Sequence, residues 1–511
     1  MIPARTQTSA CTTVLLFLWI ASALWYAVFL FSPTRVGHPL AYGLLLVAEC
    51  IGMTHMVGMW LTILFARRPA PSPEFLRQRE ALERGQRSPS VAVFVTVAGE
   101  PVEVVRTTVT AARDMAVAHR TVVLDDGSSD DVRQMARNLG VEYLCRGTNE
   151  GRKAGNVNYA LARVQSEYFV ILDSDFVPAR EFLLETLPYL LNNPRLAFVQ
   201  TPQSYGNDET FIAGGSAEIQ GVFYRHVQVG KNAFNAAFCV GTNVIFRRAA
   251  VDEVGGMYQE SNSEDIWTSL LLHERGWDSF YTPQVLAVGR SPETVDAYLR
   301  QQFRWARGGF EIFFGRNPLL SSGLSLDQKI QYFLTTSHYL HSVSIFIYFL
   351  LPLLYVYAGL KPIDTVEGAS MWAMHFVPYF LSVFGGSAYL AGRMLSWRSL
   401  VVSIAAFPSH IMAMLSVLTG LDLRWSVTGE IRRSVDYVQS VIPQICMLLL
   451  SLGAIPLLFL QSRPGDAGVH LIMAFWLACN SVLLVSVCKR ALPAFDRAPV
   501  LLSSLSVRDA L

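Results

Sequence analysis

The chain has 511 residues, of which 52% are hydrophobic and only 16% are charged, and its formal net charge is +1. This composition is too apolar for an ordinary soluble enzyme, and the near-zero charge excludes the strong positive field that would favour nucleic acid as a partner. The seven cysteines are scattered without zinc-site spacings, so we expect reduced thiols and no disulfide framework.

Apolar runs lie before and after a charged central region that extends from about residue 69 to residue 315. A spanning helix takes roughly 20 predominantly apolar residues, and these runs supply them. The first run is too long for the core of a signal peptide, and no small-residue cleavage site follows it. We therefore predict six crossings, at residues 12–33, 41–65, 332–360, 369–391, 437–461 and 469–488.

A further apolar run, residues 400–421, is compatible with either a crossing or a helix in the membrane interface, because it contains Pro408 and His410. Lysine and arginine collect in cytoplasmic loops, so the basic residues at the ends of the runs give the orientation. They alternate cleanly between the two sides if this run lies in the interface. That arrangement places both termini and the central region in the cytosol, and by analogy we expect a bacterial plasma (inner) membrane. Seven crossings are the alternative.

Four ionisable residues fall inside predicted spans: Glu49, His338, His341 and His375. Residues of this kind usually face a cavity or a polar partner within a bundle. They either line a path through the bundle or form hydrogen bonds between helices.

The central region alternates between apolar runs with strand character and segments with helical periodicity. Strands are predicted at residues 91–97, 121–124 and 168–172, and helices at residues 103–115, 130–139 and 156–164. The alternation predicts an α/β domain with a mainly parallel sheet covered by helices. In such sheets, ligands bind beyond the carboxyl ends of the strands.

Two acidic pairs follow predicted strands and therefore lie at that edge of the sheet. Asp125-Asp126-Gly127 ends the second strand, and Asp173-Ser174-Asp175 ends the third. Mg²⁺ or Mn²⁺ prefers oxygen ligands and is usually held by one or two carboxylates together with substrate phosphates. Each pair taken alone is also compatible with an ordinary Asp-rich turn.

Three further motifs carry groups that suit an anionic diphosphate, a proton transfer and a sugar ring. Lys153-Ala154-Gly155-Asn156 places a cation and small residues at a helix start, as a diphosphate requires. Ser263-Glu264-Asp265 offers a carboxylate that can act as a general base, although the serine also fits a helix N-cap. Gln301-Gln302-Phe303-Arg304-Trp305 offers arginine for phosphate and tryptophan for a sugar ring, or alternatively an amphipathic helix with a snorkelling arginine.

Together and in this order, the five motifs resemble glycosyltransferase family 2, in particular its cellulose synthase-like branch. The resemblance covers roughly residues 91–315 and includes Phe223-Tyr224, the segment 235–243 and Trp305-Ala306-Arg307-Gly308. It implies a GT-A (Rossmann-like) catalytic domain at 69–315, inserted in an α-helical transmembrane bundle. The bundle would consist of a helix pair at 1–68 and further helices at 316–511, with an interfacial helix and a gating loop at about 400–436.

The resemblance also implies roles for individual residues. On the donor side, Asp125, Asp126 and Lys153 would lie near the nucleotide and diphosphate, Asp173 and Asp175 would serve the metal and diphosphate, and Asp265 would be the catalytic base beside the substrate-binding Glu264. On the acceptor side, Cys239, Gly241 and Thr242 would line the site, while Gln301, Arg304 and Trp305 would hold the donor diphosphate and the terminal sugar of the chain.

The implied activity is that of a processive, inverting, Mg²⁺- or Mn²⁺-dependent transferase. It would polymerise a UDP-sugar, most simply UDP-glucose, into a β-glucan and export the growing polysaccharide through its own helices across the lipid bilayer. The alternatives are a non-processive transferase acting on a lipid acceptor and a membrane scaffold with an inactive domain. Two stretches depart from the family pattern: Thr96-Val97-Ala98-Gly99-Glu100 lacks the tyrosine that stacks on uracil, and the gating-loop-like Trp425-Ser426-Val427-Thr428 lacks the usual lysine after it.

Overall fold

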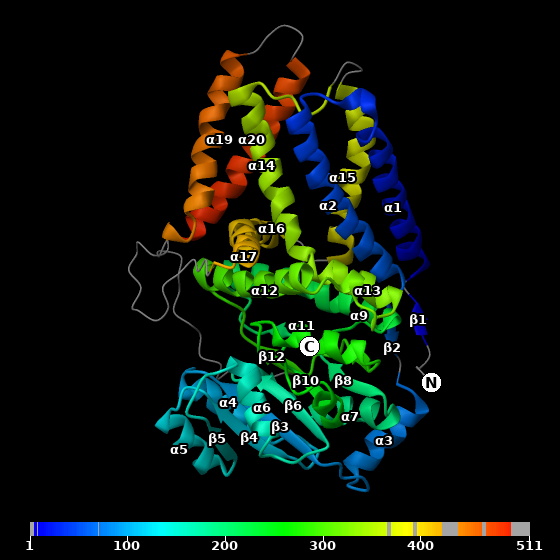
Figure 1. Cartoon of the computed structure of the whole chain (residues 1–511), viewed down its shortest axis with the longest axis vertical. Helices are drawn as coiled ribbons and strands as arrows, with labels where there is room; N and C mark the ends of the chain where they lie inside the picture. The colour runs from blue at the N-terminus through cyan, green and yellow to red at the C-terminus, as the bar shows by residue number, and fades with distance from the viewer. Residues whose placement is uncertain are drawn as a thin grey trace.

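The computed structural model describes residues 5–7, 9–69, 71–364, 369–391, 396–421, 438–461 and 467–491. Figure 1 shows two layers, with upright apolar helices above and a helix-covered sheet below. Helices α12 (Val295–Gly315) and α13 (Leu326–Thr336) lie flat between the two layers. A ligand bound at the upper edge of the sheet would therefore lie directly beneath the helical bundle.

The lower layer is built on a seven-stranded sheet with the order β11-β8-β10-β6-β3-β4-β5. Every strand pair is parallel except the two that β10 makes, with β6 and with β8. The predicted mainly parallel sheet is thus confirmed. Its strands are β3 (Val91–Val97), β4 (Arg120–Asp125), β5 (Glu142–Cys145), β6 (Tyr168–Asp173), β8 (Leu196–Gln200), β10 (Val244–Arg247) and β11 (Asp278–Tyr281).

Central strand β3 explains why the sheet lies in the middle of the domain. All seven of its residues are buried, and successive side chains point to opposite faces. Val93 and Val95 join one hydrophobic cluster, whereas Ala92 and Phe94 join another. Both faces of the sheet are therefore covered, as a parallel sheet requires.

The covering helices agree with the predicted ones, with one shift. Ser129 caps the start of α5, and Gly140 ends it in the left-handed conformation. Helix α6 begins at Arg152 and not at residue 156, so Lys153 lies in its first turn. The helices of this layer are α3 (Pro73–Glu83), α4 (Val102–Arg113), α5 (Asp130–Leu139), α6 (Arg152–Leu161), α7 (Phe182–Asn192), α8 (Phe211–Val222), α9 (Gln228–Lys231), α10 (Arg248–Glu253) and α11 (Glu264–Glu274).

Short strands complete the lower layer and join it to the bundle. A small sheet has the order β7-β12-β9, and β1 pairs with β2 at the foot of the first two upright helices. These strands are β1 (Arg5–Gln7), β2 (Arg67–Pro69), β7 (Val177–Pro178), β9 (Ser204–Tyr205) and β12 (Ala287–Gly289).

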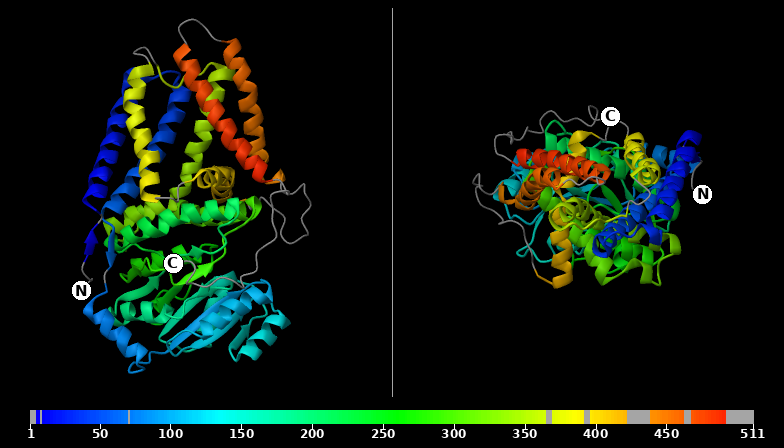
Figure 2. Two further views of the ribbon diagram at one scale, coloured as in Figure 1. Left: turned by 180° about the vertical axis from the view of Figure 1, so that it is seen from behind. Right: turned by 90° about the horizontal axis from the view of Figure 1, so that it is seen from above.

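The upper layer consists of upright helices, seen from behind and from above in Figure 2. One of the predicted spans is partly wrong. The chain turns at Ser337, so the first residues of the predicted span 332–360 belong to the flat helix α13, and the upright helix begins only at His341. The upright helices are α1 (Ala10–Leu30), α2 (Pro39–Leu64), α14 (His341–Ala358), α15 (Ala369–Ala391), α19 (Ile442–Leu460) and α20 (Ala467–Arg490).

The run predicted to lie in the interface forms two short helices. Length and composition alone would let the stretch Trp397–Thr419 cross a membrane, and the same criteria do not select α15. The stretch is nevertheless broken at Ala406 into α16 (Trp397–Ala405) and α17 (Phe407–Thr419), which lie beside α12 at the foot of the bundle. Helix α15 stands upright beside α1. This geometry favours six crossings over seven. The gating-loop-like Trp425–Thr428 lies outside the described residues.

Two of the four ionisable residues in the spans are packed between helices. Glu49 accepts a hydrogen bond of 3.2 Å from the Tyr26 hydroxyl. The ring of His375 stacks between Trp25 and Phe29, with centroid distances of 4.6 and 4.8 Å. Neither residue needs a path through the bundle to satisfy it.

The other two ionisable residues lie at the foot of the bundle. His338 and His341 cluster there with His55, and the side chain of His338 is exposed. Lining of a path by these two residues remains a prediction.

Candidate active site

The carboxyl ends of β3, β4 and β6 bring the two acidic pairs to one edge of the sheet. In the strand register Val97 lies opposite Asp125, and Thr96 lies opposite Asp173. The hydroxyl of Thr96 donates to Asp173 Oδ1 at 3.2 Å. The two acidic pairs therefore flank the end of β3, where a parallel sheet binds its ligands.

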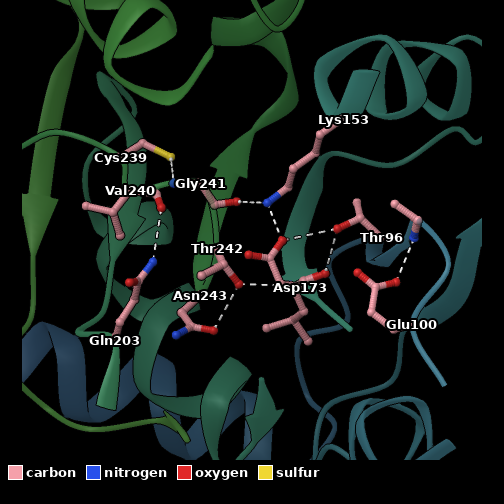
Figure 3. A network of polar contacts seen from close by, with 12 residues as sticks. Thr96, Glu100, Lys153, Asp173, Gln203, Cys239, Val240, Gly241, Thr242 and Asn243 are labelled. Atoms are coloured by element: carbon pink, nitrogen blue, oxygen red, sulfur yellow. Dashed lines mark hydrogen bonds and ion pairs between the residues drawn. The ribbon is translucent and has the colours of Figure 1, made fainter. Parts of the chain in front are cut away.

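Lys153 joins the donor-side and acceptor-side segments predicted from the sequence. Its ammonium donates to Asp173 Oδ1 and, at 2.8 Å, to the carbonyl oxygen of Gly241 (Figure 3). Burial disfavours the charged amine, but the carboxylates of Asp173, Glu264 and Asp265 outweigh burial and raise the pKa of Lys153. A fixed cation thus lies among the carboxylates at the edge of the sheet.

Gly241 is the point at which the acceptor segment meets the Glu264-Asp265 pair. A Cβ built on Gly241 would lie 3.4 Å from Asp265 Oδ2, 3.7 Å from Lys153 Nζ and 3.8 Å from Glu264 Oε1. Its φ of +86° is one that other residues rarely adopt. Residues far apart in the sequence are therefore assembled around one small region that has no side chain in its centre.

Burial and neighbouring charge perturb the carboxyl groups of this region. Burial, and next the charge of Glu264, raises the pKa of Asp265 to about 7. Burial, and next the negative charges of Asp173 and Glu100, raises the pKa of Asp175 to about 7. A pKa near neutrality suits a general base at Asp265. At Asp175 the raised pKa reflects burial first and the neighbouring carboxylates second.

The oxygens of the Asp125-Asp126 pair accept hydrogen bonds from the protein itself. Asp125 accepts from the backbone N–H groups of Gly127 and Ser129 and from the Tyr143 hydroxyl, at 2.8, 2.9 and 2.8 Å. The side chain of Asp126 is buried and accepts two hydrogen bonds from Arg146, a pairing that the sequence did not predict. Contact of these carboxylates with a nucleotide stays a prediction.

Cys239 and Thr242 lie behind Gly241 and are fully buried. The sulfur of Cys239 accepts from the Gly241 N–H at 3.3 Å, and the hydroxyl of Thr242 accepts from the Asp173 N–H at 2.9 Å (Figure 3). Both side chains hold the turn at Gly241, which is itself buried. Their predicted role as lining residues of an acceptor site is untested, and these contacts give them a bracing role.

Helix α12 places the Gln-x-x-Arg-Trp motif above this region. Arg304 is exposed. Burial raises the pKa of Glu264, and the charges of Lys153 and Arg304 partly oppose that rise. Trp305 is half-buried, and the side-chain oxygen of Gln301 is buried with no hydrogen-bond partner among the residues that the structure describes. An orphaned buried acceptor next to an exposed arginine is the arrangement expected where a polar ligand completes the site.

The comparisons with known proteins agree with this geometry. The family model described as glycosyl transferase family group 2 matches residues 168–458, more than half of the chain. The chain belongs to this family. Membership places it among glycosyltransferases, and the sheet and helices of the lower layer are the GT-A fold expected for the family.

Among family group 2 relatives, the chain is cellulose synthase-like. It is 34% identical over 326 residues to putative cellulose synthase 2 of Komagataeibacter xylinus, covering 62% of this chain and 21% of that protein. It is 31% identical over 345 residues to the UDP-forming cellulose synthase catalytic subunit of Pseudomonas fluorescens, covering 65% and 46%. The chain thus spans between about a fifth and just under half of these relatives.

A solved structure of a mannosyltransferase from Pyrobaculum calidifontis, in complex with GDP-Man and Mn²⁺, overlaps 74% of this chain and 100% of that chain. The sequences are 16% identical and the TM-score is 0.49.

The residues present fit a hard divalent cation held jointly with substrate. The described part of the chain has no group of three or more His, Cys, Asp or Glu side chains that could hold a metal by itself. The Asp173-Asp175 pair nevertheless supplies two carboxylates, and burial, followed by the charges of Asp173 and Glu100, raises the pKa of Asp175. Mg²⁺ is typically bound by one or two carboxylates plus substrate phosphates, so two protein ligands suffice.

Three residues near the site were not selected from the sequence. Thr96 and Glu100 border the Asp173-Asp175 pair, and Glu100 also accepts from the Ala98 N–H at 2.7 Å. Both belong to the stretch that departs from the family pattern, so the position of that stretch at a strand end was the available signal. Arg146 gave no such signal, because an isolated arginine in a loop has many possible partners.

Proposed function

We propose that this chain is a processive, inverting glycosyltransferase that polymerises a nucleoside diphosphate sugar, UDP-glucose, into a β-glucan and exports it through its own helices. The observation that carries the proposal is the assembly around Gly241. Lys153 and Asp265 meet there from separate parts of the chain, beside the Asp173-Asp175 pair and beneath the Gln-x-x-Arg-Trp helix. The resemblance to UDP-forming cellulose synthase subunits supports the choice of donor.

The donor diphosphate would lie between Lys153 and Arg304. Both cations would stabilise the negative charge that develops on the leaving diphosphate as the glycosidic bond to the nucleotide breaks. A Mg²⁺ or Mn²⁺ ion held by Asp173 and Asp175 would neutralise further charge on the same phosphates. Before the donor arrives, Lys153 pairs with Asp173, which keeps the cation oriented toward the edge of the sheet.

Asp265 would remove the proton from the acceptor hydroxyl. The hydroxyl oxygen then attacks the anomeric carbon from the face opposite the leaving diphosphate, so the α-linked donor gives a β-linkage. The raised pKa of Asp265 makes it a stronger base than an exposed aspartate while leaving it largely ionised above neutrality. Gly241 leaves room beside this carboxylate, because any side chain there would occupy the space in front of it.

The position of α12 supports export of the product. The helix carries Trp305 and packs against interfacial helix α17 through Ala306, Phe310 and Ala413. The bundle stands directly above it (Figure 1). A sugar stacked on Trp305 would therefore be next to the upright helices. The exposed His338 at the foot of α14 would border the path.

The decisive test is incorporation of radiolabelled sugar by membranes that contain the full chain. Each UDP-sugar is supplied with and without Mg²⁺ or Mn²⁺, beside the Asp265→Asn variant, and insoluble product is digested with linkage-specific glycanases. We expect metal-dependent polymer from UDP-glucose that a β-glucanase degrades, and loss of about 10²–10⁴ in rate for the variant. Short or lipid-extractable product would instead identify a lipid glycosyltransferase. Absence of transfer from every donor would contradict the proposed activity.

A further inference from the structure

Arg146 occupies the centre of a buried polar cluster next to the start of α6. Its side chain is 7% exposed, and that of Asp126 is 6% exposed. Arg146 Nε donates to Asp126 Oδ1 at 2.6 Å, and Nη2 donates to Oδ2 at 2.8 Å. This two-pronged pairing occupies both carboxylate oxygens in a fixed geometry, which is the arrangement that a guanidinium forms and an ammonium cannot.

The same guanidinium also holds the backbone that leads into α6. Arg146 Nη1 donates to the Glu150 carbonyl at 2.5 Å, and Nη2 donates to the Arg152 carbonyl at 2.6 Å. Four hydrogen bonds therefore join one buried side chain to Asp126 on one side and to the segment 150–152 on the other. A cluster with this many satisfied groups holds its members in one arrangement.

The segment that Arg146 holds has an unfavourable backbone conformation. Gly151 has φ +65° and Arg152 has φ +49°, so two consecutive residues, one of them not glycine, are left-handed. Such a pair persists only where its surroundings fix it. Gly155 shows how closely the cluster packs, because a Cβ there would lie 2.5 Å from Arg146 Nη1 and 2.2 Å from the Glu150 carbonyl oxygen.

Lys153 is the next residue along the chain, and its direction depends on this segment. Its ammonium reaches Asp173 and the Gly241 carbonyl from the first turn of α6. A change in the backbone torsions at Gly151 or Arg152 would swing that turn and move the amine away from both partners. Arg146 is thus connected to Asp173 and Gly241 through the backbone that carries Lys153.

We propose that Arg146 is a positioning residue for Lys153, and that Asp126 serves as the fixed counter-ion of Arg146 and not as a nucleotide ligand. The inference rests on the proposed function for the role of Lys153 toward a diphosphate. The hydrogen bonds from Arg146 to Asp126 and to the segment 150–152, called the clamp below, form without substrate and can therefore be tested without any donor.

The first arm of the test measures backbone hydrogen exchange in the detergent-solubilised full chain without nucleotide. Arg146→Met and Asp126→Asn should each speed exchange about tenfold in the segment 147–155, with other segments unchanged, because charged hydrogen bonds that close the segment are lost. Arg146→Lys, which keeps the charge opposite Asp126, serves if the methionine variant does not fold, and should give a smaller increase. Arg133→Met is the matched control, since Arg133 pairs with Asp130 at 2.7 Å on the exposed surface of α5.

The second arm measures binding of UDP with Mg²⁺ to the same preparations. Arg146→Met and Lys153→Met should each weaken binding by about tenfold, and the double variant should bind no more weakly than Lys153→Met alone, because the two residues act as one unit. Additive losses would overturn the proposal, since Arg146 would then act independently of Lys153. Weaker UDP binding by Asp126→Asn with unchanged exchange in segment 147–155 would also overturn it and make Asp126 a direct ligand. If the wild-type protein bound no UDP, the proposed donor would fail, while the exchange arm would still decide whether the clamp exists.

Discussion

Gly308 of α12 packs directly against Ser263, the residue that precedes the Glu264-Asp265 pair. A Cβ built on Gly308 would lie 1.7 Å from Ser263 Oγ and 2.2 Å from Ser263 Cβ. A second contact lies one turn further along α12, where Glu311 accepts a hydrogen bond of 2.5 Å from Ser261. The helix that carries the Gln-x-x-Arg-Trp motif is therefore in contact with the loop that presents the candidate base.

Gly308→Ala should damage activity far more than its size suggests. The new methyl group would overlap the Cβ of Ser263, which cannot rotate away, so the loop or the helix must shift and carry Asp265 with it. A displacement of about 1 Å in a catalytic group can cost about 10²-fold in rate. The measurement is polymer synthesis by membranes with matched protein levels.

Gly315→Ala is the matched control, because it lies on the same helix and a Cβ there would meet nothing within 4 Å. We expect it to retain wild-type activity. Equal activities for the two variants would show that the contact between α12 and the Ser263 loop does not position the base.

The pH dependence of the rate should report the ionisation of Asp265. Its pKa is raised to about 7 by burial and by the charge of Glu264, and only the ionised form accepts a proton. The rate should therefore rise with pH up to about 7 and level off above it, falling about tenfold per unit below. Replacement of Glu264 by Gln removes the neighbouring charge and should lower the pKa of Asp265. The fall in rate on the acidic side should therefore begin at a lower pH. If the rate of the Glu264→Gln variant fell at the same pH as that of the wild type, Glu264 would not influence the ionisation of Asp265.

The metal requirement should depend on Asp175 more than on Glu100. Asp175→Asn removes one of two proposed metal carboxylates, so half-maximal activity should need about 10–100 times more Mg²⁺. Glu100→Gln removes a nearby charge without removing a proposed ligand and should change the requirement less. Titration of Mg²⁺ into chelator-treated membranes measures both. An unchanged requirement in Asp175→Asn would exclude it as a ligand.

The sequence predicted those elements whose signals are local. Residues 91–97 and 130–139 were assigned correctly, because the first is a continuous apolar run and the second is bounded by Ser129 and Gly140. The turn at Ser337 was missed, since neither glycine nor proline marks it and apolar residues lie on both sides of the short polar stretch 335–338.

The contacts that assemble the site are not local and so could not be read in the same way. The motifs gave Lys153, Asp173 and Asp265 as candidates, but not that they would converge on Gly241. The burial of Asp126 against Arg146 depends on how β4 and the chain after β5 are placed beside one another. Only the folded backbone fixes that placement.

The last prediction concerns an ion pair that joins helix α16, at the foot of the bundle, to helix α8 of the lower layer. Arg398 Nε of α16 donates to Glu218 Oε1 of α8 at 2.6 Å, and Arg398 Nη1 donates to the Asp208 carbonyl at 3.0 Å. Gly214 and Gly215 of α8 allow this approach, since a Cβ on either would lie within 3 Å of Arg398. Helix α8 continues into the π-helical turn Phe223–Val227, which carries the aromatic pair of the acceptor-side segment.

Arg398→Met should therefore destabilise the junction between the layers and leave Glu218 buried without its counter-ion. The side chain of Arg398 is 32% exposed, so solvent weakens the pair, and we expect a loss of about 1–2 kcal/mol and a fall in Tm of about 2–5 °C in detergent. Arg84→Met, which removes an exposed pair with Glu80 on α3, should leave the Tm unchanged. If the pair also holds α8 in register with α16, Arg398→Met will shorten the product at a temperature where the variant remains folded. A lowered Tm with wild-type product length would confine the role of the pair to stability.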